Sequence, residues 1–154
     1  MPLPPFQVTL DEHRDSVARF LVASVGRQDA DDCLQETLLS ALRAYPRLRP
    51  GSNVRAWLLT IARNKAMDWH RTRVRQPVLV GDVPETPVTD AIPDHDPELW
   101  EAVRELPHKQ RAAVTLRFVN DLSHREIAVV LECTEAAARR SLHEGLVKLR
   151  EEWA

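Results

Sequence analysis

The stretch VRAWLLTIARNKAMDWHRTR, residues 54–73, predicts a long helix with one apolar side and one basic side. At about 100° per residue, Leu58 and Trp69 fall on the first side, and Arg55 and Arg63 fall on another. Apolar side chains gain free energy by leaving water, whereas arginine keeps its charge in solvent or against a phosphate. We therefore expect this helix to pack inward by its apolar side and to carry a basic outer face.

Two further helices are expected before this one, at residues 10–25 and 30–45. The second has the clearer pattern, because Leu34, Leu38 and Leu42 recur at helical spacing and are expected in the core. Its start is acidic, and carboxylates stabilise the positive end of a helix dipole. The N-terminal half of the chain is therefore expected to form a small helical bundle.

The C-terminal half also predicts helices only. A short helix at 98–106 and a second at 107–120 precede a third at 123–131. After a turn at 132–133, the leucines of residues 134–149 keep helical spacing. Two helices joined by a turn of about three residues form the helix-turn-helix pattern. The whole chain is thus predicted to be all-α.

Residues that cap helix N-termini support three of these helix starts. Ser52 or Asn53 precedes the long basic helix, and Thr134 precedes the last helix. Ser123 and Glu126 have the S-x-x-E spacing of a capping box, in which each side chain accepts a hydrogen bond from the other residue's backbone.

Charge divides the 154 residues into three segments, although the formal net charge is only −2. Residues 1–75 carry twelve basic against eight acidic side chains, and eight of the basic ones lie within 47–75. Residues 76–97 contain five prolines and five acidic residues but no basic residue, which is typical of a flexible acidic linker. Residues 98–154 are nearly balanced. We expect two small helical domains, 1–75 and 98–154, with nucleic-acid phosphates bound by the first.

Other classes of protein are disfavoured by what the chain lacks. No apolar run approaches the roughly 18 residues of a membrane span, and the first residues do not resemble a signal peptide, so we expect a cytoplasmic protein. Cys33 and Cys133 belong to no C-x-x-C pair and are expected to be free thiols. No P-loop, H-E-x-x-H or Ser/His/Asp arrangement is present, so we expect no enzyme, no catalytic residue, no metal and no cofactor.

Three groups of motifs follow one another along the chain: DADDCLQET at 29–37, the R-A-W-L and I-A-R-N strings within 54–68, and the pairs L-P, L-S and L-H in the C-terminal half. In this order they resemble the extracytoplasmic-function (ECF) sigma factors of bacteria, a sigma-70 group that keeps only regions 2 and 4. Residues 29–37, DADDCLQET, are similar to the region 2 helix that docks on the clamp coiled coil of RNA polymerase. Residues 54–68 are similar to the promoter-melting helix with its R-A-W-L and I-A-R-N strings. The pairs L-P at 106–107, L-S at 122–123 and L-H at 142–143 resemble region 4. The resemblance covers nearly the whole chain.

This resemblance implies an alternative sigma factor that binds core RNA polymerase, selects promoters and melts the −10 element. Polymerase contacts would be made by Asp29, Asp32, Gln35 and Glu36. The −10 DNA would be bound by Arg47, Ser52, Asn53, Arg55, Arg63, Asn64, Lys65, Arg71 and Arg73. The −35 DNA would be bound by Arg117, Arg125, Thr134, Arg139, Arg140 and His143.

The implied partners are core polymerase, through its clamp coiled coil and flap, promoter DNA and an anti-sigma factor. The linker at 76–97 would either thread a basic channel of the polymerase or serve only as a tether. Two positions depart from the family pattern: Glu132 stands where glycine is usual, and Glu144 where a basic residue is common. These departures concern the −35 contact rather than the fold.

Three other functions stay open at this point. A stand-alone transcription regulator would bind duplex DNA through the helix-turn-helix without polymerase. A sigma-like decoy would occupy an anti-sigma factor and never initiate transcription. A nuclease would need a carboxylate cluster for metal, for which Asp29, Asp31 and Asp32 are the candidates, although they lie in the docking motif.

Overall fold

The computed structural model describes residues 3–75 and 97–152, and within these ranges every regular element is helical. The elements are α1 (Phe6–Val25), α2 (Arg27–Ala44), the 3-10 turn η1 (Tyr45–Arg47), α3 (Val54–Arg75), α4 (Pro97–Glu105), α5 (His108–Phe118), α6 (His124–Leu131) and α7 (Glu135–Glu152). The all-α prediction is confirmed. The expected linker at 76–97 lies outside the described residues except for Pro97, the first residue of α4. None of the described helices is long and apolar enough to cross a membrane.

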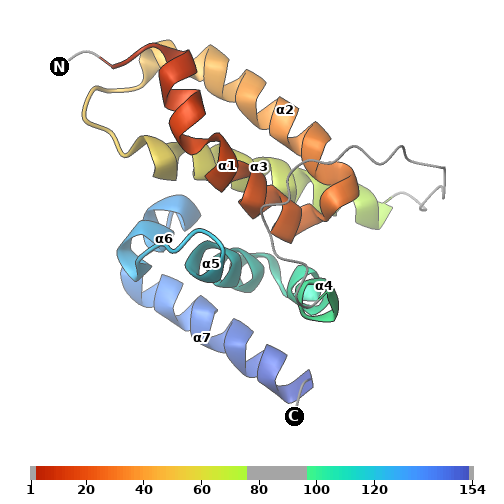
Figure 1. The fold of residues 1–154 in the computed structure, drawn as a ribbon. Coiled ribbons are helices and arrows are strands. Elements are labelled where there is room, and N and C mark those ends of the chain that lie inside the picture. The colour runs from red at the N-terminus through yellow and green to blue at the C-terminus, as the bar shows by residue number, and fades with distance from the viewer. Residues whose placement is uncertain (1–2, 76–96, 153–154) are drawn as a thin grey trace.

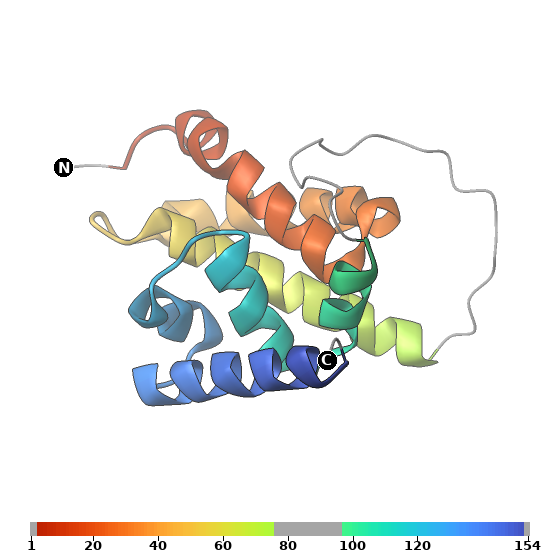
Figure 2. The same cartoon turned by 60° about the horizontal axis from the view of Figure 1, so that its bottom comes forward.

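The helices form two layers. The first half consists of α1, α2 and α3, which pack against one another, and the second half consists of α4 to α7 (Figure 1). The halves are in contact, because α3 packs on α6 while α1 packs on α4 and α5. In the rotated view, α7 runs along the outer edge of the second half, with α5 between it and the first half (Figure 2).

The turn between α1 and α2 is made by a single glycine. Gly26 has φ 87°, a conformation that residues with a Cβ rarely adopt. Its N–H donates to the carbonyl of Val22 at 2.9 Å, and its carbonyl accepts from the N–H of Ala30 at 3.1 Å. One residue thus ends α1 and begins α2, which holds the two helices side by side.

The other end of the first half is held by a buried polar pair and a short turn. The Thr9 hydroxyl lies 3.0 Å from that of Tyr45, which donates to the carbonyl of Pro4. The expected helix at 10–25 begins earlier, at Phe6, because Pro5 precedes it and supplies the first carbonyl acceptor. Pro46 lies inside η1, so the turn continues directly from α2.

All three capping predictions are confirmed. Asn53 is the cap of α3, since its Oδ1 accepts from the N–H of Ala56 at 3.1 Å. Ser123 and Glu126 form the reciprocal capping box of α6. Thr134 Oγ1 accepts from the N–H of Ala137 at 3.1 Å at the start of α7.

The apolar core is continuous across both halves. Its largest fully buried side chains in the first half include Phe20, Leu21 and Leu58, and those in the second half include Leu116 and Ile127. Joining the cores matters because a half of this size by itself buries a smaller fraction of its surface than a larger domain does and is only marginally stable.

Helices α5 and α7 approach closely at Gly145. A Cβ built on this glycine would lie 2.9 Å from Val114 Cγ2 and 3.3 Å from the carbonyl oxygen of Gln110. Val114 is buried and β-branched, so its methyl group has little room to move. The absence of a side chain at position 145 therefore sets the spacing between these helices.

Replacing Gly145 with Val should lower the free energy of unfolding by about 1–3 kcal/mol, because the added methyl groups overpack the α5–α7 contact. Chemical denaturation monitored by circular dichroism measures the change. The control is Lys148→Val on the exposed side of the same helix. Equal stability of the two variants would contradict the close approach.

Candidate nucleic-acid interface

Helix α3 carries most of the residues expected at the −10 DNA, and its apolar side is buried as predicted. Ala56, Leu58, Leu59 and Ala62 are at most 2% exposed. These residues pack between α1 and α2, so the opposite side of α3 is turned away from the first half.

Part of the expected −10 set lies on the surface. Asn64, Arg71 and Arg73 are exposed on α3, and Lys65 is half-buried. Before the helix, Arg47 and Asn53 are exposed. Ser52 is half-buried, and its hydroxyl donates to the carbonyl of Arg49 at 2.7 Å, which shapes the loop that leads into α3.

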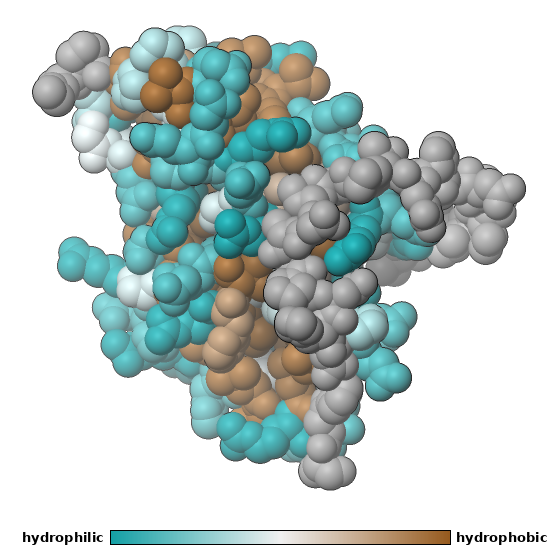
Figure 3. Space-filling view, viewed as in Figure 1, coloured by the Kyte–Doolittle hydropathy of each residue, from teal (hydrophilic) through white to brown (hydrophobic). Residues whose placement is uncertain are grey.

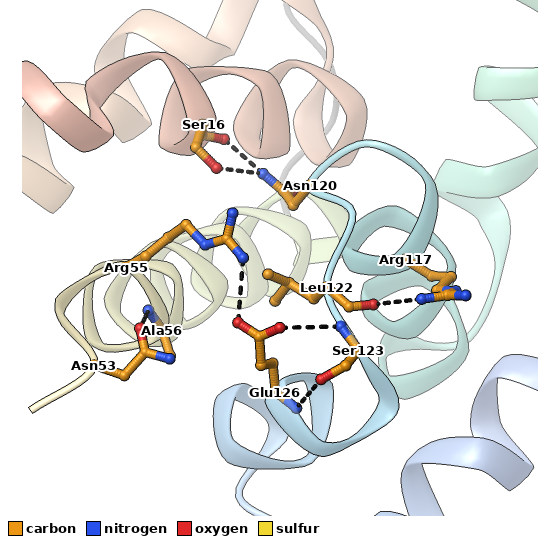
Figure 4. A network of polar contacts seen from close by, with 9 residues as sticks. All are labelled: Ser16, Asn53, Arg55, Ala56, Arg117, Asn120, Leu122, Ser123 and Glu126. Carbon is orange, nitrogen blue, oxygen red and sulfur yellow. Dashed lines mark hydrogen bonds and ion pairs between the residues drawn. The ribbon is translucent and has the colours of Figure 1, made fainter.

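The other part is covered by the second half of the protein. Arg55 Nη2 donates to Glu126 Oε2 at 3.2 Å (Figure 4). Arg63 Nη2 lies 3.7 Å from Glu132 Oε2 and donates to Asn64 Oδ1 at 3.1 Å. The expectation that Arg63 lies on an outward basic face is wrong, since only 7% of the residue is exposed. Helical periodicity places Arg63 on the basic side of α3, but α6 packs over that side.

A second polar contact joins the halves near the middle of α1. Asn120 Nδ2 donates to the carbonyl of Ser16 at 2.8 Å and contacts Ser16 Oγ at 2.9 Å (Figure 4). Asn120 is only 5% exposed. The contact positions the loop between α5 and α6, and Arg117 Nη1 stabilises the same loop by donating to the carbonyl of Leu122 at 3.0 Å.

Two histidines lie in a cationic environment where the halves meet. Burial, followed by the nearby Arg111 guanidinium, lowers the pKa of His70 to about 4. The same two causes, in the same order, lower the pKa of His108 to about 4. His70 Nε2 lies 2.7 Å from the carbonyl of Ser24, so the neutral ring donates a proton there. Both histidines are therefore neutral at pH 7.

Arg111 is itself buried between α4 and α5. Its guanidinium donates to the carbonyl of Leu106 at 3.1 Å and to that of Arg104 at 3.4 Å, and it lies 3.2 Å from His108 Nδ1. Burial lowers its pKa to about 10, which leaves the group charged at pH 7. A protonated His108 would place a second positive charge against it.

The end of α3 is tied to α2. Arg73 Nη1 donates to Asp29 Oδ2 at 3.0 Å, and its guanidinium carbon lies 4.8 Å from the centre of the Trp69 ring. Asp29, which we expect to contact polymerase, thus forms an ion pair with a residue of its own half. Trp69 is half-buried against the core, as expected.

The outer side of α2 carries the remaining expected polymerase contacts. Asp32, Gln35 and Glu36 are exposed. Beside them lie Leu39, 53% exposed, and Leu42, 52% exposed. We define the α2 face as these five residues.

The expectation of Leu42 in the core is wrong, and helical geometry explains the error. The buried residues of α2 and η1 span about 120° around the helix, from Cys33 on one side through Leu34 to Tyr45 on the other. Leu42 lies about 60° beyond Tyr45 and is therefore outside this buried arc. The sequence signal that was missed is therefore an apolar pair, Leu39 and Leu42, lying next to the polar docking motif.

In the second half, most residues expected at the −35 DNA are exposed. Arg125 lies on α6 and Thr134 precedes α7, while α7 itself carries Arg139, Arg140 and His143. Arg139 Nη2 donates to Glu135 Oε1 at 2.9 Å, an exposed pair within one helical turn. Arg117 is half-buried in the loop contact described above. The first turns of α7 thus present two arginines and an imidazole to solvent.

Apolar residues reach the surface over the second half. Figure 3 shows them as a band over the region of α4, α5 and α7, with polar residues to its left and below it. Trp100, Ala102 and Leu146 are partly buried side chains of these helices that pack against the core.

The two thiols lie in different environments. Cys33 is buried in α2, and burial, followed by the nearby Glu36 carboxylate, raises its pKa to about 12. Because the thiolate is the reactive form of cysteine, Cys33 is inert at neutral pH. Cys133 is half-buried in the turn before α7.

Comparison with known proteins matches two family models to different parts of the chain. The family model of sigma-70 region 2 matches residues 9–76, and that of sigma-70 region 4 matches residues 97–149. The ECF RNA polymerase sigma factor SigX of Bacillus subtilis is 30% identical over 94% of this chain and 81% of its own length. The RNA polymerase sigma factor CarQ of Myxococcus xanthus is 35% identical over 95% of this chain and 87% of its own length.

Solved structures share the fold. The sigma factor RpoE of Bartonella quintana, in complex with the anti-sigma factor NepR, has a TM-score of 0.74 at 22% identity and covers 97% of this chain and 96% of its own. CnrH, in complex with the cytosolic domain of CnrY, has a TM-score of 0.70 at 21% identity and covers 96% and 86%.

The histidine pair predicts that acid destabilises the packed state. Both pKa values are lowered, so the stability that neutral His70 and His108 contribute is complete above pH 6.5 and is lost as the pH falls towards 4. Between pH 7 and pH 5 we expect a loss of about 1 kcal/mol per histidine, less than the full pKa shift implies because both residues are partly exposed and water screens their charge; denaturant unfolding measures it. The double variant His70→Gln, His108→Gln should lose markedly less over this range, and an undiminished loss would contradict the assignment.

Proposed function

This chain belongs to the ECF group of RNA polymerase sigma factors, and from that membership and its surface chemistry we propose which residues carry its function. Sigma factors are not enzymes but initiation factors, which direct core RNA polymerase to promoters. We assign region 2 to residues 1–75 and region 4 to residues 98–154, with the acidic segment 76–97 as the linker between them.

We assign the loop before α3 and the outer side of α3 to the contact with the −10 element. Exposed Asn64 and half-buried Lys65 are the groups that would contact bases, since an amide offers both a donor and an acceptor. Arg47, Arg71 and Arg73 would neutralise phosphates. Ser52 and Asn53 frame the loop that would hold a flipped base, whose unstacking costs a few kcal/mol. Arg55 and Arg63 are also among the residues that we assign to contact with −10 DNA.

For the −35 element, we assign the start of α7 to the major groove. Thr134, Arg139, Arg140 and His143 would face the groove, and Arg125 would contact the backbone, as in other helix-turn-helix proteins. Arg117 would act mainly through the α5–α6 loop that it stabilises. Glu135 competes with DNA for Arg139, because the two side chains are 2.9 Å apart.

We assign the α2 face to the contact with the polymerase clamp. Asp32, Gln35 and Glu36 supply polar contacts, and Leu39 with Leu42 supplies an apolar centre that is otherwise left in water. Exposed apolar side chains rimmed by polar ones are typical of a protein-binding surface. The apolar band over α4, α5 and α7 is our candidate for the flap contact.

We further assign an anti-sigma factor as a partner and the cytoplasm as the location. One similar solved structure is of a sigma factor in complex with the anti-sigma factor NepR, and another is of CnrH in complex with the cytosolic domain of CnrY. Core polymerase and chromosomal DNA are both found in the bacterial cytoplasm, so a protein that joins them acts there.

Run-off transcription with purified core polymerase and genomic fragments tests the function. The wild-type chain should yield promoter-specific transcripts, and Asn64→Ala with Lys65→Ala should reduce them by about tenfold or more, equivalent to about 1.4 kcal/mol. Gln7→Ala with Arg14→Ala on α1 removes the same kinds of group from an unassigned surface and should have little effect.

The alternatives give different results in the same assay. An absence of transcripts together with tight duplex binding in the absence of polymerase would indicate a stand-alone regulator. An absence of both would indicate a decoy.

The α2 face makes a separate prediction. Leu39→Ser with Leu42→Ser should weaken binding to core polymerase by about tenfold, because two apolar side chains are lost from the contact. Thermal stability should change little, since both side chains are half exposed. The matched control, Leu39→Met with Leu42→Met, keeps the apolar surface and should bind as the wild type does. Equal affinity of the serine and methionine variants would remove these leucines from the interface.

A further inference from the structure

Helix α5 carries a buried arginine whose hydrogen-bond partners, among the described residues, are all uncharged. Arg111 is only 7% exposed, and its guanidinium donates to the carbonyls of Arg104 and Leu106 and to the ring of His108. Buried charges in proteins are as a rule paired, because it is costly to take an isolated ion out of water. The neutral acceptors satisfy N–H groups of Arg111 but do not balance its charge.

The same contact fixes the tautomer of His108. Arg111 Nη2 lies 3.2 Å from His108 Nδ1, and a guanidinium can only donate, so Nδ1 is the acceptor. The neutral ring therefore carries its proton on Nε2. This Nε2 is buried, and no group in the described part of the chain accepts a hydrogen bond from it. A buried donor without an acceptor destabilises the folded state.

Arg63 on α3 contributes a second buried donor of this kind. The residue is 7% exposed, and its Nε has no partner within the ranges that the structure describes, although Nη2 donates to Asn64 Oδ1. The hydroxyls of Ser24 on α1 and Thr115 on α5 are buried and unpartnered as well. Helices α1, α3 and α5 thus each supply a buried group that can donate a hydrogen bond.

These groups share one neighbourhood between the halves. His108, Arg111 and Thr115 occupy i, i+3 and i+7 positions and so lie on one side of α5. Arg63 and His70 are seven residues apart and share one side of α3. Burial lowers the pKa of His108, and Arg111 and Arg63 are the next largest causes, so both guanidinium groups act on this ring. Each nearby charge that shifts the pKa of His108 is positive.

We propose that this cluster is a binding site for a small inorganic anion, such as chloride, held between α3 and α5. Arg63 Nε and His108 Nε2 would donate to the anion, and its charge would balance that of Arg111. Ionised acceptors form the stronger hydrogen bonds with such donors. A water molecule would accept the same hydrogen bonds but would leave the charge unbalanced. The surfaces assigned above to polymerase play no part in this site.

A cavity beside the cluster gives a small ion a way in. It has a volume of about 570 Å³ and is open to solvent, and His70 and Arg104 are among the residues that line it. The backbone of Arg104 is also in contact with Arg111. Glu101 and Glu105 line the cavity too, but both are exposed on α4. An anion at the cluster can therefore exchange with solvent.

An anion shared by α3 and α5 makes the stability of the chain depend on the anion in solution. A ligand that binds only the folded state shifts the unfolding equilibrium by mass action. At about ten times the dissociation constant, the unfolding constant should be about elevenfold lower than without the anion. The effect saturates, which distinguishes binding at one site from a general influence of salt.

Denaturant unfolding of the full chain at pH 7 tests the site, with sodium gluconate replaced stepwise by sodium chloride at constant ionic strength. Gluconate is too bulky for a buried cluster. The site variant, Arg63→Met with His108→Phe, keeps a long side chain and a ring but removes both donors. The matched control, Arg150→Met with His124→Phe, makes the same replacements outside the cluster.

Wild type and control should gain stability along a saturating curve as chloride replaces gluconate, whereas the site variant should not. The same response in site variant and control would overturn the proposal. So would a wild-type chain whose stability does not depend on chloride. Neither DNA nor polymerase is present, so the result is independent of the function proposed above.

Nuclear magnetic resonance of the wild-type imidazole groups decides the question if the site variant does not fold. Chloride should shift the ring resonances of His108 and His70 along a saturating curve. His13 and His143 lie outside the cluster and serve as internal controls, so their resonances should not follow that curve. Unshifted resonances of His108 and His70 would overturn the anion site and indicate that water completes these hydrogen bonds.

Discussion

The contact of Arg63 with α6 is the constraint around which the two halves are arranged. A guanidinium that is buried without an anionic or carbonyl partner is costly, and Glu132 and Asn64 supply oxygens for it. Its position fixes which side of α3 the second half covers. The arrangement then brings Glu126 to Arg55 and Asn120 to Ser16, so three contacts spread along the halves set a single orientation.

The interface between the two halves contributes stability, but it covers part of the surface that we propose for DNA. Each half is small, and the shared apolar cluster adds buried surface that neither half has by itself. Arg55 and Arg63, which we propose for −10 DNA, contact the second half through Glu126 and Glu132. The interface combines apolar packing with the Arg55–Glu126 ion pair, whose side chains are each about one-third exposed and which therefore adds little net stability.

The surfaces proposed for different partners are not equally accessible in this arrangement. The α2 face and the start of α7 lie in solvent, whereas on α3 Arg63 is buried and the side chain of Arg55 is about one-third exposed. The surface proposed for the polymerase clamp is therefore open in this arrangement, and part of the surface proposed for −10 DNA is not.

The amino-acid sequence by itself determined the local structure of the protein. Helix positions, the caps at Asn53, Ser123 and Thr134, and the turn at residues 132–133 depend on neighbours within a few positions, so they follow from pattern and capping chemistry. Family motifs extended this to the family and its function, which the comparisons with known proteins confirm, whereas the site residues stay predictions. The tertiary structure alone decided the burial of Arg63, because its partner lies 69 positions further along the chain. It also decided that Leu42 faces solvent, since periodicity indicates a side of a helix but not the width of the arc that its neighbours bury.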